Sequence, residues 1–232
     1  MSDVSERYDI RMMAAYVRGT LGQGGPLFNA PLDQLTVGEC EALLEAGITA
    51  GLKLHHFKRH ETLPRVKAVM GFLRGVQPES LLDVGSGRGV FLFPFMREFP
   101  WVPVTSLDIL DKRVTLLNAI HDGGMENLTA LKASICDWDA PDAAFDVVTL
   151  LEVLEHIPDV QAAVKNAVRL ARRYVVVTVP SKPDDNPEHI YLLTKPVLTE
   201  LFGTAGCNRL QFEGVPGHLF MVASLDRRKQ EA

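Results

Sequence analysis

The spacing of hydrophobic residues changes near residue 80. Residues 1 to about 60 show helical spacing and turn residues but no convincing strand, and the stretch 19–31, with four glycines and two prolines, is typical of a loop. From Ser80 onward, short apolar runs alternate with segments in which apolar residues recur at helical spacing. Such alternation predicts a parallel sheet that is covered by helices on both faces.

The same pattern predicts the individual elements. Strands are predicted at 81–84, 102–108, 128–134, 145–151, 174–179, 209–213 and 218–224. Helices are predicted at about 37–57, 62–75, 111–121, 159–171 and 196–205, and one more runs from the glycine-rich turn to about 99. Asp111 is predicted to cap the helix 111–121. The short turn between the last two strands indicates an antiparallel hairpin. We therefore expect a Rossmann-like α/β fold: a seven-stranded, mostly parallel sheet with helices on both faces, an antiparallel last strand and an N-terminal helical extension.

Composition narrows the functional classes. The chain has 24 Lys and Arg against 29 Asp and Glu, a net charge of −5, which argues against a protein that binds duplex DNA. Its 3 cysteines are widely separated, so we expect no disulfide framework and a cytoplasmic, reducing compartment. The polar N-terminus and the lack of a run of about 18 apolar residues predict neither a signal peptide nor a membrane span.

A glycine-rich turn follows the first predicted strand and opens a helix. It reads Gly85-Ser86-Gly87-Arg88-Gly89, and glycines in such a turn permit positive φ and let a ligand approach the backbone. A tight turn with no ligand is the simpler interpretation. The third glycine comes one residue too early for a dinucleotide site, and the Gly-Lys-Ser/Thr ending of a phosphate-binding loop is absent.

Four carboxylates lie at the ends of neighbouring predicted strands: Asp83, Asp108, Asp137 and Glu152. In open α/β sheets, ligands bind beyond the carboxyl ends of the strands. Such a set would repel a pyrophosphate but would suit a ligand that carries positive charge and free ribose hydroxyls. Asp108 lies 19 residues after Gly89, near the position of the acid that holds a ribose in related folds, although a helix cap would also explain it.

Four segments together resemble the motifs of class I S-adenosylmethionine-dependent methyltransferases: 81–89, 107–108, 136–138 and 145–159. The resemblance covers residues 62–225, and it leaves 1–61 as a helical extension that could form a substrate lid and 226–232 as a polar tail. It implies S-adenosylmethionine as the cofactor. It also implies that the loop with Gly85, Ser86, Gly87 and Gly89 cradles the methionine part, with Asp83 facing its ammonium.

The nucleoside part would be held by residues that follow the second and third strands. The resemblance implies that Asp108 holds the ribose hydroxyls, with Ile109 against the adenine. Asp137 would bind the adenine amino group, and Trp138 would lie beside the ring. For Trp138, packing in the core is an equally open interpretation.

A second group of polar residues follows the fourth strand. Glu152, Glu155 and His156 are spaced so that a helical turn would place them on one face, and His189 lies in a polar loop that should return to the same rim. We interpret His156, assisted by Glu152, as the catalytic base, because histidine titrates near neutral pH. Capping of the turn is the structural alternative.

The same four side chains could also bind a divalent metal. In that arrangement Glu152, Glu155, His156 and His189 resemble the metal site of small-RNA 3′-end 2′-O-methyltransferases. The predicted function is methyl transfer to a small-molecule acceptor, with a metal-assisted RNA 3′-terminal 2′-O-methyltransferase as the alternative. A nicotinamide-linked oxidoreductase is disfavoured by the glycine spacing, and a non-catalytic binding module stays open. No other nucleic acid and no membrane is expected as a partner, and the sequence sets neither the acceptor atom nor the oligomeric state.

Overall fold

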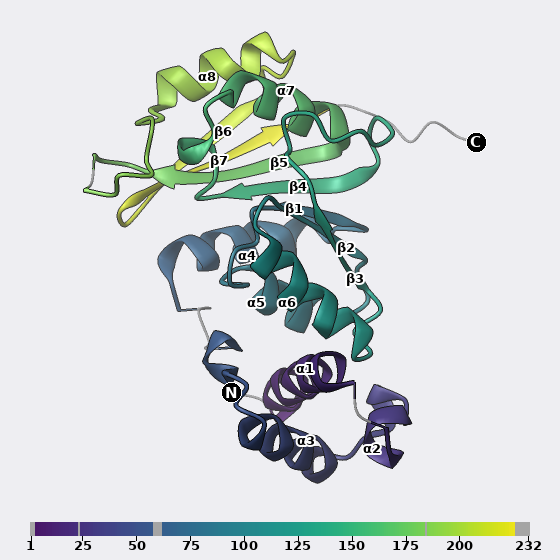
Figure 1. The fold of residues 1–232 in the computed structure, drawn as a ribbon. Coiled ribbons are helices and arrows are strands. Elements are labelled where there is room, and N and C mark those ends of the chain that lie inside the picture. The colour runs from purple at the N-terminus through teal and green to yellow at the C-terminus, as the bar shows by residue number, and fades with distance from the viewer. Residues whose placement is uncertain (1–2, 23, 58–61, 184, 226–232) are drawn as a thin grey trace.

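A computed structural model of the chain describes residues 3–22, 24–57, 62–183 and 185–225. The predicted polar tail at 226–232 lies outside these residues. The described part contains a seven-stranded sheet with helices on both faces and further helices at the N-terminus, as the hydrophobic pattern predicts (Figure 1). None of the described helices combines the length and the apolar character needed to cross a membrane.

The order of the strands creates a switch point in the middle of the sheet. The strands run in the order β3-β2-β1-β4-β5-β7-β6. Their bounds are β1 Leu81–Val84, β2 Val104–Asp108, β3 Leu128–Lys132, β4 Phe145–Leu151, β5 Ala171–Pro180, β6 Leu210–Val215 and β7 His218–Ser224. Strands β1 to β5 pair in parallel, and β7 is antiparallel to both of its neighbours, which confirms the predicted hairpin. The chain crosses from one side of β1 to the other between β3 and β4, and ligands of such folds bind at this crevice.

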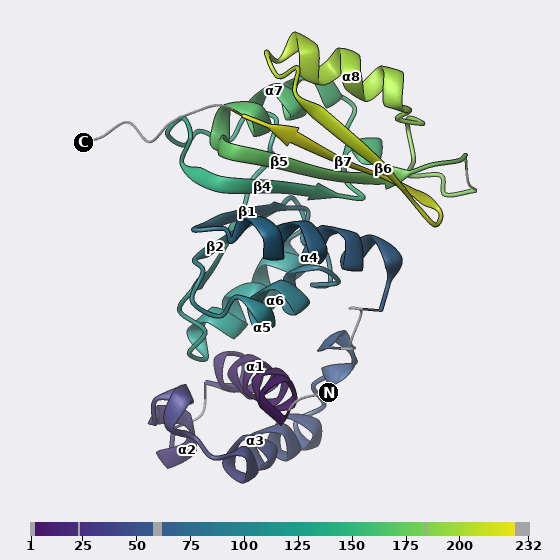
Figure 2. The ribbon, with the colours of Figure 1, turned by 180° about the vertical axis from the view of Figure 1, so that it is seen from behind.

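Helices cover the sheet in two layers. One face carries α4 (Pro64–Val76), α5 (Leu92–Glu98) and α6 (Asp111–Asp122), and the other carries α7 (Val160–Leu170) and α8 (Lys195–Thr204) (Figures 1 and 2). Alternate residues of a strand point to opposite faces, so Leu81 packs in the first layer and Leu82 in the second. The strand ends that border the switch point are therefore held between two packed cores.

The N-terminal extension forms a further layer outside the helices. It comprises α1 (Asp3–Leu21), α2 (Pro26–Asn29), α3 (Val37–Thr49) and the 3-10 turns η1 (Leu32–Gln34) and η2 (Leu54–Phe57). Helices α1 and α3 lie beyond α5 and α6, on the side away from the sheet (Figure 2). A Cβ atom at Gly19 would lie 1.9 Å from the carbonyl oxygen of Ala119, and one at Gly123 would lie 1.8 Å from that of Ala15. These glycines therefore allow α1 and α6 to approach backbone to backbone.

Several predicted boundaries are wrong for local reasons. The helix predicted to reach 57 ends at Thr49, because Gly51 has a φ of 84° and the chain then enters η2. The predicted loop at 19–31 contains the end of α1 and the short α2. Asp111 is the first residue of α6 rather than its cap, and its carboxylate accepts a hydrogen bond from Lys132 at 2.8 Å. The helix after the glycine-rich turn begins only at Leu92.

Candidate functional site

Two adjoining cavities lie at the carboxyl ends of the central strands. The larger has a volume of about 810 Å³ and the smaller about 150 Å³. Gly85, Gly87 and Glu152 line both. The glycine-rich turn after β1 and the residue after β4 therefore form the junction between the two spaces, at the switch point of the sheet.

The glycines of the turn have different roles. Gly85 and Gly87 have φ values of 66° and 58°, a region that side chains disfavour. A Cβ atom at Gly87 would meet no atom closer than 3.7 Å, so a side chain there would project into open space at the junction. Gly89 does not line either cavity, and a Cβ atom there would lie 2.5 Å from the ring of Phe93. Gly89 is therefore needed for packing, unlike the cradling role predicted for it.

Asp83 is a carboxylate buried directly beneath the turn. Its side chain is 3% exposed and accepts a hydrogen bond from the Thr149 hydroxyl at 2.6 Å. Burial raises the pKa of the Asp83 carboxyl to about 6, with a smaller contribution from nearby Asp108. Ser86 also lines the smaller cavity, but its hydroxyl lies 2.7 Å from that of Ser106 and so ties the turn to β2. A cation beside Asp83 would favour the ionised form of this carboxyl.

Asp108 ends β2 at the edge of the larger cavity. Its carboxylate accepts hydrogen bonds from the backbone N–H groups of Gly87, at 3.3 Å, and Leu110, at 2.9 Å. These bonds fix the orientation of the carboxylate and leave lone pairs for a ligand. Ile109 beside it lines the same cavity and is 67% exposed. The two residues thus come together as predicted, one polar and one apolar.

The structure does not bring Asp137 and Trp138 to this cavity. They line a separate hollow against α7, and the Trp138 ring packs beside that of Phe145 with 5.9 Å between the centroids. The interpretation of Trp138 as a packing residue is the one observed. The segment 133–136, which directly follows β3, lines the larger cavity instead. The chain turns away after it, because the Trp138 N–H donates to the Ser134 carbonyl at 3.0 Å.

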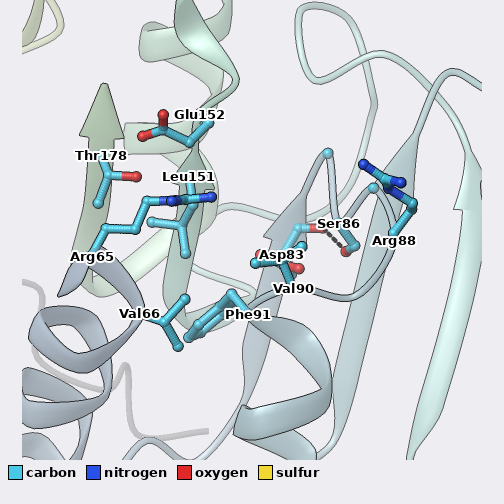
Figure 3. Close-up of a pocket in the computed structure, with 12 residues that line it drawn as sticks. Arg65, Val66, Asp83, Ser86, Arg88, Val90, Phe91, Leu151, Glu152 and Thr178 are labelled. Carbon is cyan, nitrogen blue, oxygen red and sulfur yellow. Dashed lines mark hydrogen bonds between the residues drawn. The ribbon is translucent and has the colours of Figure 1, made fainter. Parts of the chain in front are cut away.

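Three polar side chains, Arg65, Glu152 and Thr178, meet in the smaller cavity (Figure 3). Of these, the sequence analysis named only Glu152. Arg65, in the first turn of α4, extends its guanidinium into this space and has no hydrogen-bonding or ionic partner among the described residues. The Thr178 hydroxyl is fully buried without a hydrogen-bond partner, as is Oε1 of Glu152. Oε2 of Glu152 lies 3.0 Å from Nε2 of His218. Thr178 could have been found from the sequence, because it is a polar residue within the apolar strand 174–179. Nothing in the sequence pointed to Arg65 or His218.

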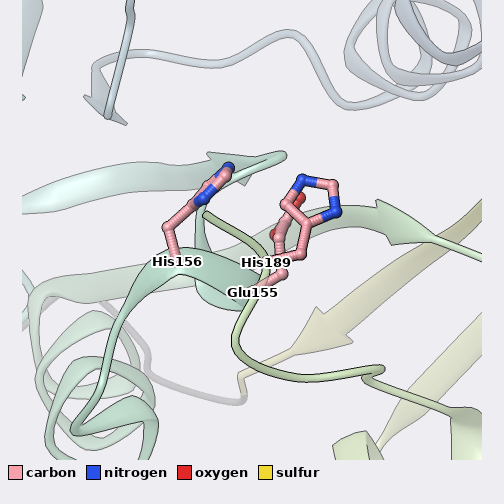
Figure 4. Close-up of side chains that lie close together, drawn as sticks. All are labelled: Glu155, His156 and His189. Carbon is pink, nitrogen blue, oxygen red and sulfur yellow. The ribbon is translucent and has the colours of Figure 1, made fainter. Parts of the chain in front are cut away.

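Glu155, His156 and His189 come together (Figure 4), and His156 among them lines the larger cavity. Their candidate ligand atoms lie within 4.8 Å of one another. His156 belongs to the 3-10 turn η3 (Leu154–His156), and its Nδ1 lies 2.9 Å from the carbonyl oxygen of Glu188. A carbonyl can only accept, so Nδ1 carries the hydrogen and Nε2 is the basic nitrogen of the neutral ring.

Glu152 does not join this group. It precedes η3 and has a φ of 58°, so the predicted helical turn that would place Glu152 on one face with Glu155 and His156 is wrong. Its carboxylate faces His218 instead. The structure therefore assembles Glu155, His156 and His189, three of the four residues of the alternative metal set.

Comparison with known proteins identifies the family. A family model described as a methyltransferase domain matches residues 54–226, which is most of the chain. A crystal structure of an S-adenosylmethionine-dependent methyltransferase from Aquifex aeolicus superposes with a TM-score of 0.56 at 19% identity, over 71% of this chain and 91% of that one. The chain therefore belongs to the methyltransferase domain family. It has the fold of class I S-adenosylmethionine-dependent methyltransferases, whose methyl donor is S-adenosylmethionine.

Curated relatives match over shorter lengths. A ubiquinone biosynthesis O-methyltransferase from Paramagnetospirillum magneticum is 35% identical over 112 residues, 48% of this chain and 40% of the relative. A ribosomal RNA small subunit methyltransferase G from Lactococcus lactis subsp. cremoris is 38% identical over 77 residues, 32% of either chain. The chain thus spans less than half the length of these relatives.

Proposed function

We propose that this protein transfers the methyl group of S-adenosylmethionine to a small-molecule acceptor. The observation that carries the proposal is the distribution of charge between the two adjoining cavities. The smaller one contains the unpaired guanidinium of Arg65 together with the buried carboxylate of Asp83 and the half-buried carboxylate of Glu152. The larger one is bordered by the carboxylate of Asp108 next to an apolar wall. These features match the two ends of the cofactor, an amino-acid zwitterion and a nucleoside.

The smaller cavity suits the amino-acid end. Arg65 would pair with the carboxylate, since a guanidinium binds carboxylates through two parallel hydrogen bonds. Asp83 and the free Oε1 of Glu152 would attract the ammonium, and the Thr178 hydroxyl would gain the hydrogen-bond partner that it lacks. The volume of about 150 Å³ is consistent with a group of this size.

The larger cavity suits the nucleoside and leaves room beyond it. Asp108 would accept hydrogen bonds from both ribose hydroxyls, as acids at this position do in dinucleotide-binding folds. Ile109 would cover one face of the adenine, and the segment 133–136 would border its edge. The remaining lining, which includes Val153, His156 and Glu188, would then face the acceptor.

When bound, S-adenosylmethionine would supply a methyl group activated on a sulfonium, with the neutral thioether of S-adenosylhomocysteine as the leaving group. The chain contributes proximity and alignment at the junction of the cavities, where Gly85, Gly87 and Glu152 meet. Nε2 of His156 would take the proton that the acceptor loses, because Nδ1 is committed to the Glu188 carbonyl.

Several observations support a small acceptor. Acidic side chains outnumber basic ones in the lining of the larger cavity, which disfavours a polyanionic acceptor. The acids are Asp108, Glu152, Asp159 and Glu188, and the basic side chains are Arg113 and His156. The relative with the longer match is named for ubiquinone biosynthesis. The three cysteines are free, which agrees with the proposed cytoplasmic location.

The N-terminal extension, which we place at 1–61, borders the cofactor turn through one aromatic contact. The rings of Phe57 in η2 and Phe93 stack with 5.1 Å between centroids, and Phe93 in turn fills the space beside Gly89. We propose that the extension influences access to the cavities through this contact, as a lid would.

A test of the proposed base uses His156→Gln. We expect kcat to fall by about 100-fold on any acceptor that the wild-type protein methylates, because the proton acceptor is lost. The affinity for S-adenosylhomocysteine, measured by calorimetry, should change little. His121→Gln on α6, remote from both cavities, is the matched control and should retain wild-type kcat. Unchanged turnover by His156→Gln would refute the role of His156 as the base.

The cluster of Glu155, His156 and His189 supports a second candidate, a metal-assisted RNA 3′-terminal 2′-O-methyltransferase. Carboxylate and imidazole ligands suit several divalent ions. In this case the protein should methylate the terminal ribose of a short RNA with Mn²⁺ or Mg²⁺ and lose that activity in a chelator. Turnover of a small acceptor that a chelator leaves unchanged would exclude the metal-assisted reaction.

A further inference from the structure

Glu152 has a conformation that its neighbours must hold in place. Its φ of 58° lies in the left-handed region, where a side-chain-bearing residue is strained and where such strain persists only if surrounding contacts fix it. Its N–H donates to the Thr178 carbonyl at 2.9 Å, which anchors the backbone to β5. Its carboxylate is anchored separately, by the contact of 3.0 Å between Oε2 and Nε2 of His218.

His218 reaches this edge of the sheet only because β7 runs backward. It is the first residue of β7 and pairs with Pro180, the last residue of β5. In a parallel strand, the first residue would lie at the opposite edge, far from the cavities. The reversed hairpin thus delivers an imidazole to the carboxyl ends of the parallel strands, next to the smaller cavity.

The hydrogen bonds of His218 define where the protons lie. Nδ1 is 3.1 Å from the carbonyl oxygen of Pro216, which can only accept, so Nδ1 carries a hydrogen. Nε2 faces a carboxylate oxygen of Glu152, and this contact is attractive only when one proton lies between the two atoms. Oε2 is therefore committed to His218, and the buried Oε1, which has no hydrogen-bond partner, is left for a ligand.

We propose that His218 is a positioning residue that holds the Glu152 carboxylate toward the ammonium of the cofactor. This inference rests on the proposed function, which assigns the amino-acid end of S-adenosylmethionine to the smaller cavity. His218 itself does not line either cavity, so its effect passes through Glu152. Arg65 acts independently at the carboxylate of the same amino-acid end.

The test compares three ligands that share the adenosine and differ at the amino-acid end. Each affinity is compared between variant and wild type, because decarboxylated S-adenosylmethionine also carries a sulfonium where the other two ligands have a thioether. S-adenosylhomocysteine has both the ammonium and the carboxylate, decarboxylated S-adenosylmethionine keeps only the ammonium, and 5′-methylthioadenosine has neither. His218→Leu should weaken the first two by about tenfold, the loss expected for one misaligned charged hydrogen bond, and should leave 5′-methylthioadenosine unchanged. His218→Gln should recover most of this affinity, because its amide N–H can still donate to Oε2.

Two further variants serve as controls, one for the carboxylate of the ligand and one for general effects on the hairpin. Arg65→Gln should weaken S-adenosylhomocysteine but leave decarboxylated S-adenosylmethionine unchanged, since the missing carboxylate is its partner. Glu213→Gln alters an exposed residue of β6 in the same hairpin and should leave all three affinities unchanged. Melting temperatures measured on each variant report any change in folding.

The outcomes are distinct. An equal loss for all three ligands in His218→Leu, or no loss for any, overturns the positioning role while the proposed function stands. A failure of His218→Gln to recover affinity also contradicts it. If the wild-type protein binds no S-adenosylhomocysteine, the proposed function fails, and this inference fails with it.

Discussion

Replacement of Asp83 by asparagine should stabilise the protein and weaken cofactor binding at the same time. Asp83 is almost completely buried, and the hydrogen bonds from the Ser86 and Thr149 hydroxyls only partly offset the effect of burial on its carboxyl. Burial therefore raises the pKa of the Asp83 carboxyl from 3.8 to about 6. A neutral amide of the same shape removes the cost of burying this charge.

The structure gives the size and the pH range of the effect. A pKa raised from 3.8 to about 6 corresponds to about 3 kcal/mol of destabilisation when the group is ionised in the folded state. A weaker hydrogen bond from Thr149 offsets about 1 kcal/mol, so Asp83→Asn should gain about 2 kcal/mol above pH 6. Because the folded-state pKa is the raised one, wild-type stability falls as pH rises from 3.8 to about 6, and the advantage of the variant disappears over the same range on acidification.

Thermal unfolding followed at about pH 7.5 and about pH 4 checks this expectation, with a predicted rise in melting temperature of about 5 °C at the higher pH only. Affinity for S-adenosylhomocysteine should fall by about tenfold, because the amide cannot pair with the ammonium. The reasoning is refuted if Asp83→Asn is less stable than the wild type at pH 7.5, or if its cofactor affinity is unchanged.

Asp146 supplies the matched control, because it is a buried aspartate at the amino end of β4, away from the cavities at the carboxyl ends of the strands. Burial raises the pKa of its carboxyl, but hydrogen bonds from Arg173, the Glu79 N–H and Arg172 outweigh burial and hold that pKa below the ordinary value. Asp146→Asn should therefore destabilise the protein, by about 3–5 kcal/mol, since two half-buried arginines lose their charged contacts with this buried carboxylate. Cofactor affinity of the folded variant should be retained.

Other changes test the cavity assignments. Asp108→Ala should weaken S-adenosylhomocysteine at least about tenfold through loss of the charged contacts to ribose, and calorimetry with an unchanged dissociation constant would count against the assignment. Gly87→Val should abolish binding, because its side chain projects into the junction of the cavities and strains a backbone φ of 58°. A normal titration by a folded Gly87→Val protein would contradict that placement.

The fold could be predicted because its signals are long and repeated. The apolar run 174–179 and the alternation of strands with helices leave few topologies, and the turn at 214–217 correctly indicates the reversed last strand. Errors arose where one residue decides a boundary. Gly51 ends a helix that the apolar spacing would continue, and Asp111 forms an ion pair with Lys132 in place of a cap.

The candidate site could be predicted only where a residue lies within about three residues of the carboxyl end of a parallel strand. Asp83, Gly87 and Asp108 satisfy this condition, and each borders a cavity. Arg65 and His218 do not, because they reach the site from the start of α4 and from the reversed β7, and their positions depend on the order of strands in the sheet. Asp137 was misplaced because the chain turns away one residue earlier.

A crystal structure of the protein with S-adenosylhomocysteine would locate both ends of the ligand at once. We expect the ribose hydroxyls within hydrogen-bonding distance of Asp108, the amino-acid carboxylate on Arg65, and the ammonium between Asp83 and Oε1 of Glu152. A ligand bound elsewhere, or one whose amino-acid end points out of the smaller cavity, would contradict this arrangement.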